Sequence, residues 1–211
     1  QDNSIIFENE NLSNHTSDIS TFMPSCLDYS YHNKMPYKID ILLNDQQFWK
    51  ENYVGAITSK QKSINNKFKV YQKASIKVYY ENKNCDYEAN VRIHGDLKDH
   101  LSFNYTASLD IRLLNGNILG NTSFKLFIPE TRNGNNEIFM NGLLKYLNLA
   151  ITSHTFFIDT NFNGIEKKLL FQSKINKNLI ENNNFREGLI IEADERFMFG
   201  GDRQNLARSD S

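Results

Sequence analysis

Alternation of apolar and polar side chains in the middle of the chain constrains the fold more than any other feature of the sequence. Apolar residues recur at every second position in four stretches, 74–80, 87–93, 109–113 and 123–128. Successive side chains of a β-strand point to opposite faces of its sheet, so this period of two predicts strands with one buried face. The turn sequences ENKN at 81–84 and LNGN at 114–117 join these strands in pairs, as in β-hairpins.

The rest of the chain predicts further strands and three helices. The strands are expected over 37–43, 154–160, 167–171 and 188–195, and the helices over 45–53, 137–147 and 175–182. Asn44 is expected to cap the first helix and Gly55 to end it. The polar residues 95–106 are expected to form a mobile loop. Because the strands follow one another too closely for parallel crossovers, we expect an α+β fold with a mostly antiparallel sheet and a few packed helices.

Composition suggests three parts along the chain. Residues 1–35 are polar and rich in Asn and Ser, which predicts an irregular arm. Residues 36–200 hold the predicted strands and helices and are expected to form one α+β domain. Residues 201–211 are expected to be either a tail or the start of a C-terminal part that this chain lacks. The 211 residues are enough to bury a substantial core.

Charge, hydropathy and cysteine content narrow the possible partners. A net charge of -1 lacks the basic excess of nucleic-acid-binding proteins, so no nucleic acid is expected. No stretch approaches ~18 consecutive apolar residues, so no membrane span is predicted. The scattered His and Cys residues predict no zinc site. Cys26 and Cys85 are either two unrelated thiols or a single disulfide formed in an oxidising compartment, and both alternatives stay open.

Three cations lie on the polar faces of the predicted strands. Arg92, Arg112 and Lys125 occupy positions opposite the apolar sets of their strands. If these strands pair in one sheet, the three side chains converge and could bind phosphate, because Arg offers a bidentate fork and Lys a compact charge. The alternative is an ordinary solvated sheet face. The segment GDLKDH at 95–100 could close over a nucleotide, although a solvated loop is the simpler interpretation.

Five acidic residues are further candidates. Glu137 opens the helix after the strand of Lys125, an order that protein kinases use to hold the nucleotide phosphates, and Glu130 is a second candidate. The alternative is that Glu137 only favours a helix N-terminus. Glu192, Asp194 and Glu195 could bind a divalent metal through oxygen ligands, or simply be solvated charges at a strand end.

Several short motifs between residues 91 and 197 resemble the spore-coat protein H (CotH) family of atypical, secretory protein kinases. The motifs are RIHG at 92–95, LDIRL at 109–113, FKLFIPETRN at 124–133, NFNG at 161–164, SKI at 173–175 and FREGLIIEADERF at 185–197. The family has a Glu before its Lys-Ile pair, where this chain has Ser173. The family's catalytic and metal-binding Asp residues belong further along than Ser211.

The resemblance implies the nucleotide-binding part of a CotH-like kinase, shaped like the N-terminal lobe of an atypical protein kinase. Such a kinase would use ATP with Mg or Mn to phosphorylate Ser or Thr of secreted or envelope proteins, outside the cell or in the cell envelope. By this resemblance Arg92, Arg112 and Lys125 face the nucleotide phosphates, with Glu137 as a partner of the Lys. The departures imply either a fragment of a longer protein or a lobe without a catalytic centre of its own.

A non-catalytic alternative comes from a different functional class. The chain would then be an extracellular interaction or structural module, similar to a pseudokinase, that binds a surface protein or polymer. Its polar, Asn-rich surface and the missing catalytic acids favour this alternative. The sequence leaves enzymatic activity, acceptor substrate and oligomeric state open.

Overall fold

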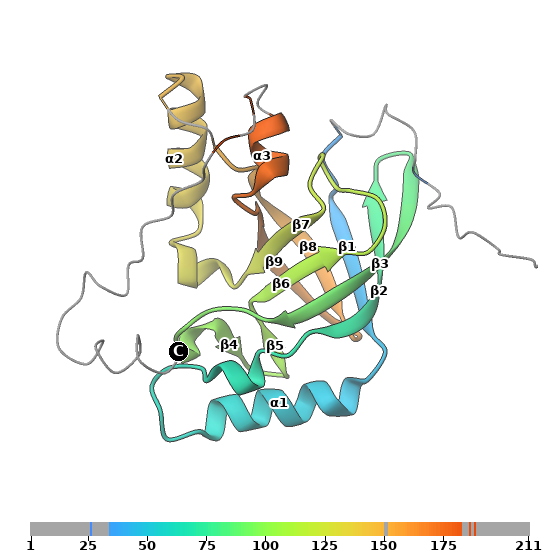
Figure 1. Cartoon of the computed structure of the whole chain (residues 1–211), viewed down its shortest axis with the longest axis vertical. Coiled ribbons are helices and arrows are strands. Elements are labelled where there is room, and N and C mark those ends of the chain that lie inside the picture. Colours follow the sequence, from blue (N-terminus) through green and yellow to red (C-terminus); the bar gives the residue numbers. More distant parts are fainter. Residues whose placement is uncertain (1–25, 27–33, 150–151, 183–185, 187, 189–211) are drawn as a thin grey trace, which may run out of the picture.

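The alternating stretches of the sequence form strands that surround one hydrophobic core (Figure 1). The structure is a computed structural model that describes residues 26, 34–149, 152–182, 186 and 188. The strands are β1 (Lys38–Leu43), β2 (Gln72–Tyr80), β3 (Lys83–Ile93), β4 (Leu101–Ser102), β5 (Thr106–Ala107), β6 (Leu109–Leu113), β7 (Ser123–Phe127), β8 (Thr155–Phe162) and β9 (Ile165–Ser173). The α-helices are α1 (Gln46–Thr58), α2 (Asn135–Tyr146) and α3 (Lys177–Asn182).

Seven of the described strands close into a barrel in the order β1-β2-β3-β6-β7-β9-β8. Neighbouring strands pair antiparallel except β1 and β8, which pair in parallel with Lys38 opposite Asp159 and Ile41 opposite Phe162. The predicted α+β fold, resembling a kinase lobe with packed helices, is therefore wrong. Alternation identifies each strand, but it carries no signal for a pairing between strands so far apart in the sequence.

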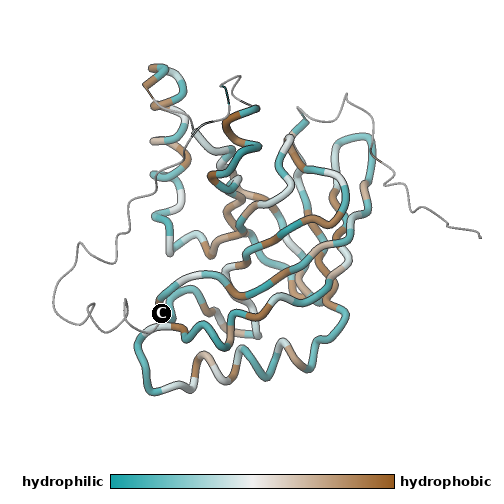
Figure 2. Tube along the Cα trace, in the orientation of Figure 1, coloured by the Kyte–Doolittle hydropathy of each residue, from teal (hydrophilic) through white to brown (hydrophobic). Residues whose placement is uncertain are grey.

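The barrel interior is filled by the inward-facing half of each strand. In β2, for example, Ala74, Ile76 and Val78 are buried while the residues between them reach the surface. Figure 2 shows the resulting alternation of hydrophobic and hydrophilic positions along the barrel strands. Phe171 stacks between two other rings, with centroid distances of 4.8 Å to Phe124 and 4.7 Å to Phe156. Each buried side chain of this size contributes ~1.5–3 kcal/mol to stability.

Helix α1 covers one end of the barrel (Figure 1). Trp49 and Tyr53 are buried in the core, and the Trp49 ring lies 4.9 Å from that of Phe162. Asp45, and not the predicted Asn44, caps the helix, because its Oδ1 accepts a hydrogen bond from the Phe48 backbone N–H at 2.9 Å. The helix begins one residue after its predicted start at residue 45.

Gly55 does not end α1 as predicted, since the helix continues to Thr58. The glycine has a packing role: a Cβ at this position would lie 2.4 Å from Cε1 of Phe68. The predicted loop 95–106 is not wholly irregular. It contains β4 and β5, whose turn is joined to α1 by a hydrogen bond from Trp49 Nε1 to the Tyr105 carbonyl at 2.8 Å.

Helix α2 projects beside the barrel and does not pack into it (Figure 1). None of its residues is buried, so the apolar stripe that predicted the helix does not join the core. Within the described residues, no helix has the length and apolar content needed to cross a membrane. Most of the predicted N-terminal arm, the tail and the late acidic strand lie outside the described residues.

A disulfide joins Cys26 to Cys85 of β3, which decides between the two alternatives that the sequence left open. The bridge closes a loop with a sequence separation of 59 residues. It ties Cys26 to the barrel wall.

We expect Cys26→Ser to lower the free energy of unfolding by ~4 kcal/mol, because the unfolded chain regains the entropy of the open loop. Urea unfolding of both proteins without reductant measures the loss. Dithiothreitol should bring the wild-type protein close to the variant and leave the variant unchanged. Two free thiols in wild-type protein purified without reductant, detected by mass spectrometry, would contradict the bridge.

Candidate cation-lined anion site

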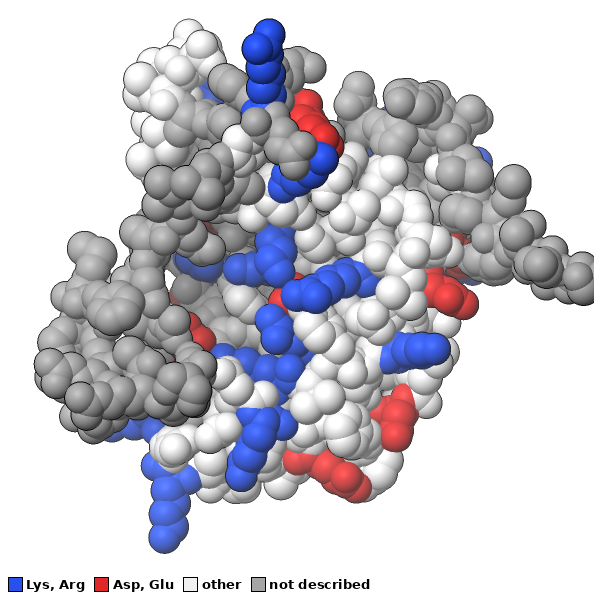
Figure 3. Space-filling model, in the orientation of Figure 1, with Lys and Arg blue, Asp and Glu red and all other residues white. Residues whose placement is uncertain are grey.

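The structure places the three predicted cations on neighbouring strands of one barrel wall. Arg92 of β3 is opposite Asp110 of β6, and Asp110 is opposite Lys125 of β7. The row continues to Gln172 of β9. Arg112 lies two residues further along β6, on the same outer face. Figure 3 shows Lys and Arg side chains gathered in a band over this wall.

Tyr71 holds two of these cations together. The guanidinium carbons of Arg92 and Arg112 each lie 4.5 Å from the centroid of the Tyr71 ring. Cation–π contacts of this kind contribute ~0.5–2 kcal/mol each. Two guanidinium groups that would otherwise repel each other are therefore kept on one ring, with Arg112 exposed to solvent.

Asp110 is the buried counter-charge of the wall. Its Oδ2 accepts hydrogen bonds from Arg92 Nη2 at 2.8 Å and from the Tyr71 hydroxyl at 2.7 Å, and Lys174 Nζ lies 3.7 Å from its Oδ1. Only 1% of Asp110 is exposed. Burial alone would raise the pKa of Asp110, but the Tyr71 hydrogen bond and the charges of Lys174 and Arg92 outweigh it and hold the pKa below its ordinary value. The carboxylate therefore stays ionised at neutral pH.

The contact with Asp110 raises the pKa of Tyr71, whereas it lowers the pKa of Asp110. Burial, together with the hydrogen bond to Asp110 and the charge of that carboxylate, raises the pKa of Tyr71 to about 12. Its hydroxyl therefore keeps its proton and remains a donor. We call the four cations Arg92, Arg112, Lys125 and Lys174, with Tyr71 and Asp110, the cationic wall.

A second group of rings and cations borders the cationic wall. Phe127 is fully buried, and Arg132 lies 4.5 Å from its ring centroid, with Lys125 at 5.8 Å. The rings of His94 and His100 also pack on Phe127, at 5.3 and 6.0 Å. Burial, followed by the charge of Lys125, lowers the pKa of His94 to about 3, so this imidazole is neutral at physiological pH.

The remaining predicted site residues are not part of the cationic wall. Glu137 Oε1 accepts a hydrogen bond from Gln172 Nε2 at 2.7 Å, so this Glu is linked to the register partner of Lys125. Lys98 does not extend toward the cationic wall, because its Nζ donates to the Ile57 carbonyl at 3.0 Å, at the end of α1. Glu192, Asp194 and Glu195 lie outside the described residues. Among the residues described, no group of His, Cys, Asp or Glu is arranged to hold a metal ion.

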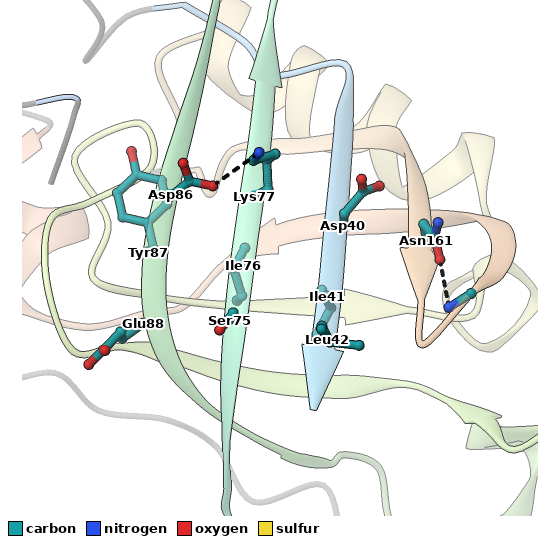
Figure 4. A pocket seen from close by; sticks show the side chains of 11 residues that line it. Asp40, Ile41, Leu42, Ser75, Ile76, Lys77, Asp86, Tyr87, Glu88 and Asn161 are labelled. Atoms are coloured by element: carbon teal, nitrogen blue, oxygen red, sulfur yellow. Dashed lines mark hydrogen bonds and ion pairs between the residues drawn. The ribbon is translucent and has the colours of Figure 1, made fainter. Parts of the chain in front are cut away.

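The neighbouring wall of β1, β2 and β3 carries an open hollow of about 470 Å³ (Figure 4). Asp40, Asp86 and Glu88 line it together with Lys77, which pairs with Asp86 at 3.6 Å. Carboxylates outnumber cations here, whereas cations outnumber carboxylates on the cationic wall. An anion is therefore attracted to the cationic wall and repelled by the wall of β1, β2 and β3.

Sequence reasoning missed Tyr71, Asp110 and Lys174 as members of the site. Alternation did place Asp110 on the same face as Arg112, so one signal for it was present. Lys174 follows β9 and reaches Asp110 only because β9 pairs with β7. Tyr71 precedes β2, and no local pattern indicates its contact with two arginines.

The sequence matches no protein-family model, and no curated protein matches it. The resemblance to the CotH family therefore stays a prediction.

We expect Asp110→Asn to lower the free energy of unfolding by about 2 kcal/mol, because Arg92 and Lys174 lose their shared counter-charge. Their partial exposure keeps the loss below the ~3–5 kcal/mol of fully buried pairs. Urea unfolding at neutral pH measures the difference. Asp86→Asn is the matched control, because its pair with Lys77 is exposed and should change stability by under ~1 kcal/mol. Equal losses in both variants would refute the role of Asp110.

We also expect stability to fall as the pH drops from neutral toward 4. Burial lowers the pKa of His94, His100 and His154. Below the ordinary His pKa of 6.5, the unfolded chain therefore binds protons that the folded chain does not. Each such His removes up to ~1.4 kcal/mol per pH unit, and for His94 the loss continues to about pH 3.

Urea midpoints at about pH 7.5 and about pH 5 measure this loss. His94→Gln should show a smaller drop than the wild-type protein, because the substituted side chain does not titrate. A drop of the same size in both proteins would show that His94 does not contribute.

Proposed function

We propose that this chain is a binding module that holds a phosphate-bearing anion, such as the polyphosphate of a nucleotide, on the cationic wall. The observation that carries the proposal is the grouping of four cations on one barrel wall. Arg92 and Lys174 pair with the buried Asp110, and the guanidinium groups of Arg92 and Arg112 lie on Tyr71. Lys125 is the strand partner of Asp110. Because Asp110 neutralises only part of this charge, the described residues of the wall keep a positive excess. Guanidinium and ammonium groups that are already positioned lose little side-chain entropy on binding phosphate.

Phosphoryl transfer to Ser or Thr of a secreted protein is the finer prediction, and it rests on the resemblance to the CotH family. In that case Arg112 and Lys125 would hold the phosphates of ATP, and the accompanying Mg or Mn would neutralise further charge. The closed barrel gives more support to the non-catalytic alternative, because its strands enclose their own core and α2, the helix that carries Glu137, has no buried residue. We therefore favour anion binding without catalysis over phosphoryl transfer.

The test measures binding of inorganic triphosphate and of ATP, each with and without magnesium, by isothermal titration calorimetry. We expect Arg112→Ala and Lys125→Ala each to weaken binding about tenfold or more, because each removes a charged donor to the anion. Both ligands should bind less tightly at higher salt, since these charges are partly screened.

Lys77→Ala is the matched control, because it removes a cation from the neighbouring, carboxylate-rich wall. Its affinity should equal that of the wild-type protein. Arg92 is left intact because it also stabilises Asp110. Unchanged affinity in both Arg112→Ala and Lys125→Ala would remove the proposed site, and binding of ATP without binding of triphosphate would show that the nucleoside is the recognised part.

A further inference from the structure

The turn between β4 and β5 carries the tripeptide Asn104-Tyr105-Thr106, the Asn-x-Ser/Thr acceptor pattern of N-linked glycosylation. The pattern occurs at Asn11, Asn14, Asn104 and Asn121, and the first two lie outside the described residues. In a chain so rich in Asn the tripeptide arises readily by chance. The surroundings of Asn104 and Asn121 therefore decide which one can carry a glycan.

Asn104 lies at the exposed tip of the turn. Its φ of 62° is in the left-handed region, which Asn tolerates better than most residues. The next residue is anchored, because the Tyr105 carbonyl accepts the hydrogen bond of Trp49 Nε1 and the Tyr105 ring lies 5.4 Å from that of Tyr53. Tyr105 is thus fixed on α1 while Asn104 is exposed to solvent.

Asn121 has the opposite surroundings. It is fully buried, and its Nδ2 donates to the carbonyl of Leu119 at 2.8 Å. A sugar on this nitrogen would replace one of its two N–H donors and, because Asn121 is fully buried, would have no space in the folded protein. The folded protein is therefore incompatible with a glycan at Asn121.

We infer that Asn104 is an N-glycosylation site, used when the chain passes through the secretory pathway. The donor is a polyprenyl-diphosphate-linked oligosaccharide. The Asn104 amide nitrogen forms a bond to the anomeric carbon, the bond from that carbon to the diphosphate oxygen breaks, and the amide proton passes to the base of the transferase. No oxidant or reductant takes part.

Two further observations support this site. The Cys26–Cys85 bridge is of the kind that forms in the oxidising compartments where glycans are added. The neighbouring Phe103 is 89% exposed, an unusual position for so large an apolar side chain. The first sugars on Asn104 would cover this ring and keep it from self-association.

The experiment expresses the full chain behind a cleavable signal sequence in cultured animal cells, with Asn11 and Asn14 replaced by Gln. We expect the secreted protein to carry one glycan that peptide:N-glycosidase F removes, leaving Asp at position 104 in peptide mass spectra. Asn104→Asp should abolish the glycan while tolerating the same backbone conformation, and Thr106→Ser should keep it because the acceptor pattern survives.

An unmodified Asn104 in secreted protein whose disulfide has formed would overturn the inference. Glycan on Asn121 in secreted protein with a cooperative thermal transition would overturn it as well, because burial would then fail to discriminate the two positions. If Asn104→Asp is poorly secreted, the wild-type peptide spectrum alone decides. None of these results depends on anion binding by the cationic wall.

Discussion

The parallel pairing of β1 with β8 is the constraint on which the rest of the structure depends. An open seven-stranded sheet would leave two rows of unpaired backbone groups and two surfaces to cover. Closure of the barrel pairs the backbone groups of both edge strands. It also gives the sheet a single interior, which the apolar side chains at alternate positions of each strand fill. Every polar half then faces outward. Helix α1 covers one end of the barrel, and charged side chains occupy the outer wall.

The charges on that outer wall are organised around Asp110. A buried carboxylate is costly unless its neighbours stabilise it, and here Tyr71, Arg92 and Lys174 do so together. The cost explains why these groups are fixed in place: each would lose a partner if it moved away. The arrangement also leaves Arg112 exposed beside the fixed cluster. Positive charge is thus held in a defined geometry, which is the physical basis for the anion-binding role.

Much of the local structure could be predicted because short-range physics determines it. The hairpin around the turn 81–84 depends on neighbouring residues and appears close to its expected place. β6 and β7 also pair as predicted, but residues 114–122 connect them, a longer segment than the predicted turn 114–117. The faces of Arg92 and Arg112 follow from the same alternation. The errors have a common cause, which is contact with distant residues: Gly55 continues a helix against Phe68, and the turn after β4 is ordered by Trp49.

The sequence by itself determined which residues are in strands and which side chains share a face, because a period of two fixes both wherever one face is buried. It also supplied three of the four cations of the cationic wall. The tertiary structure decided that the sheet closes, that Lys174 meets Asp110, and that one ring of Tyr71 holds two guanidinium groups. These depend on strand order and register between distant segments, and no local pattern encodes which distant strand will become a neighbour.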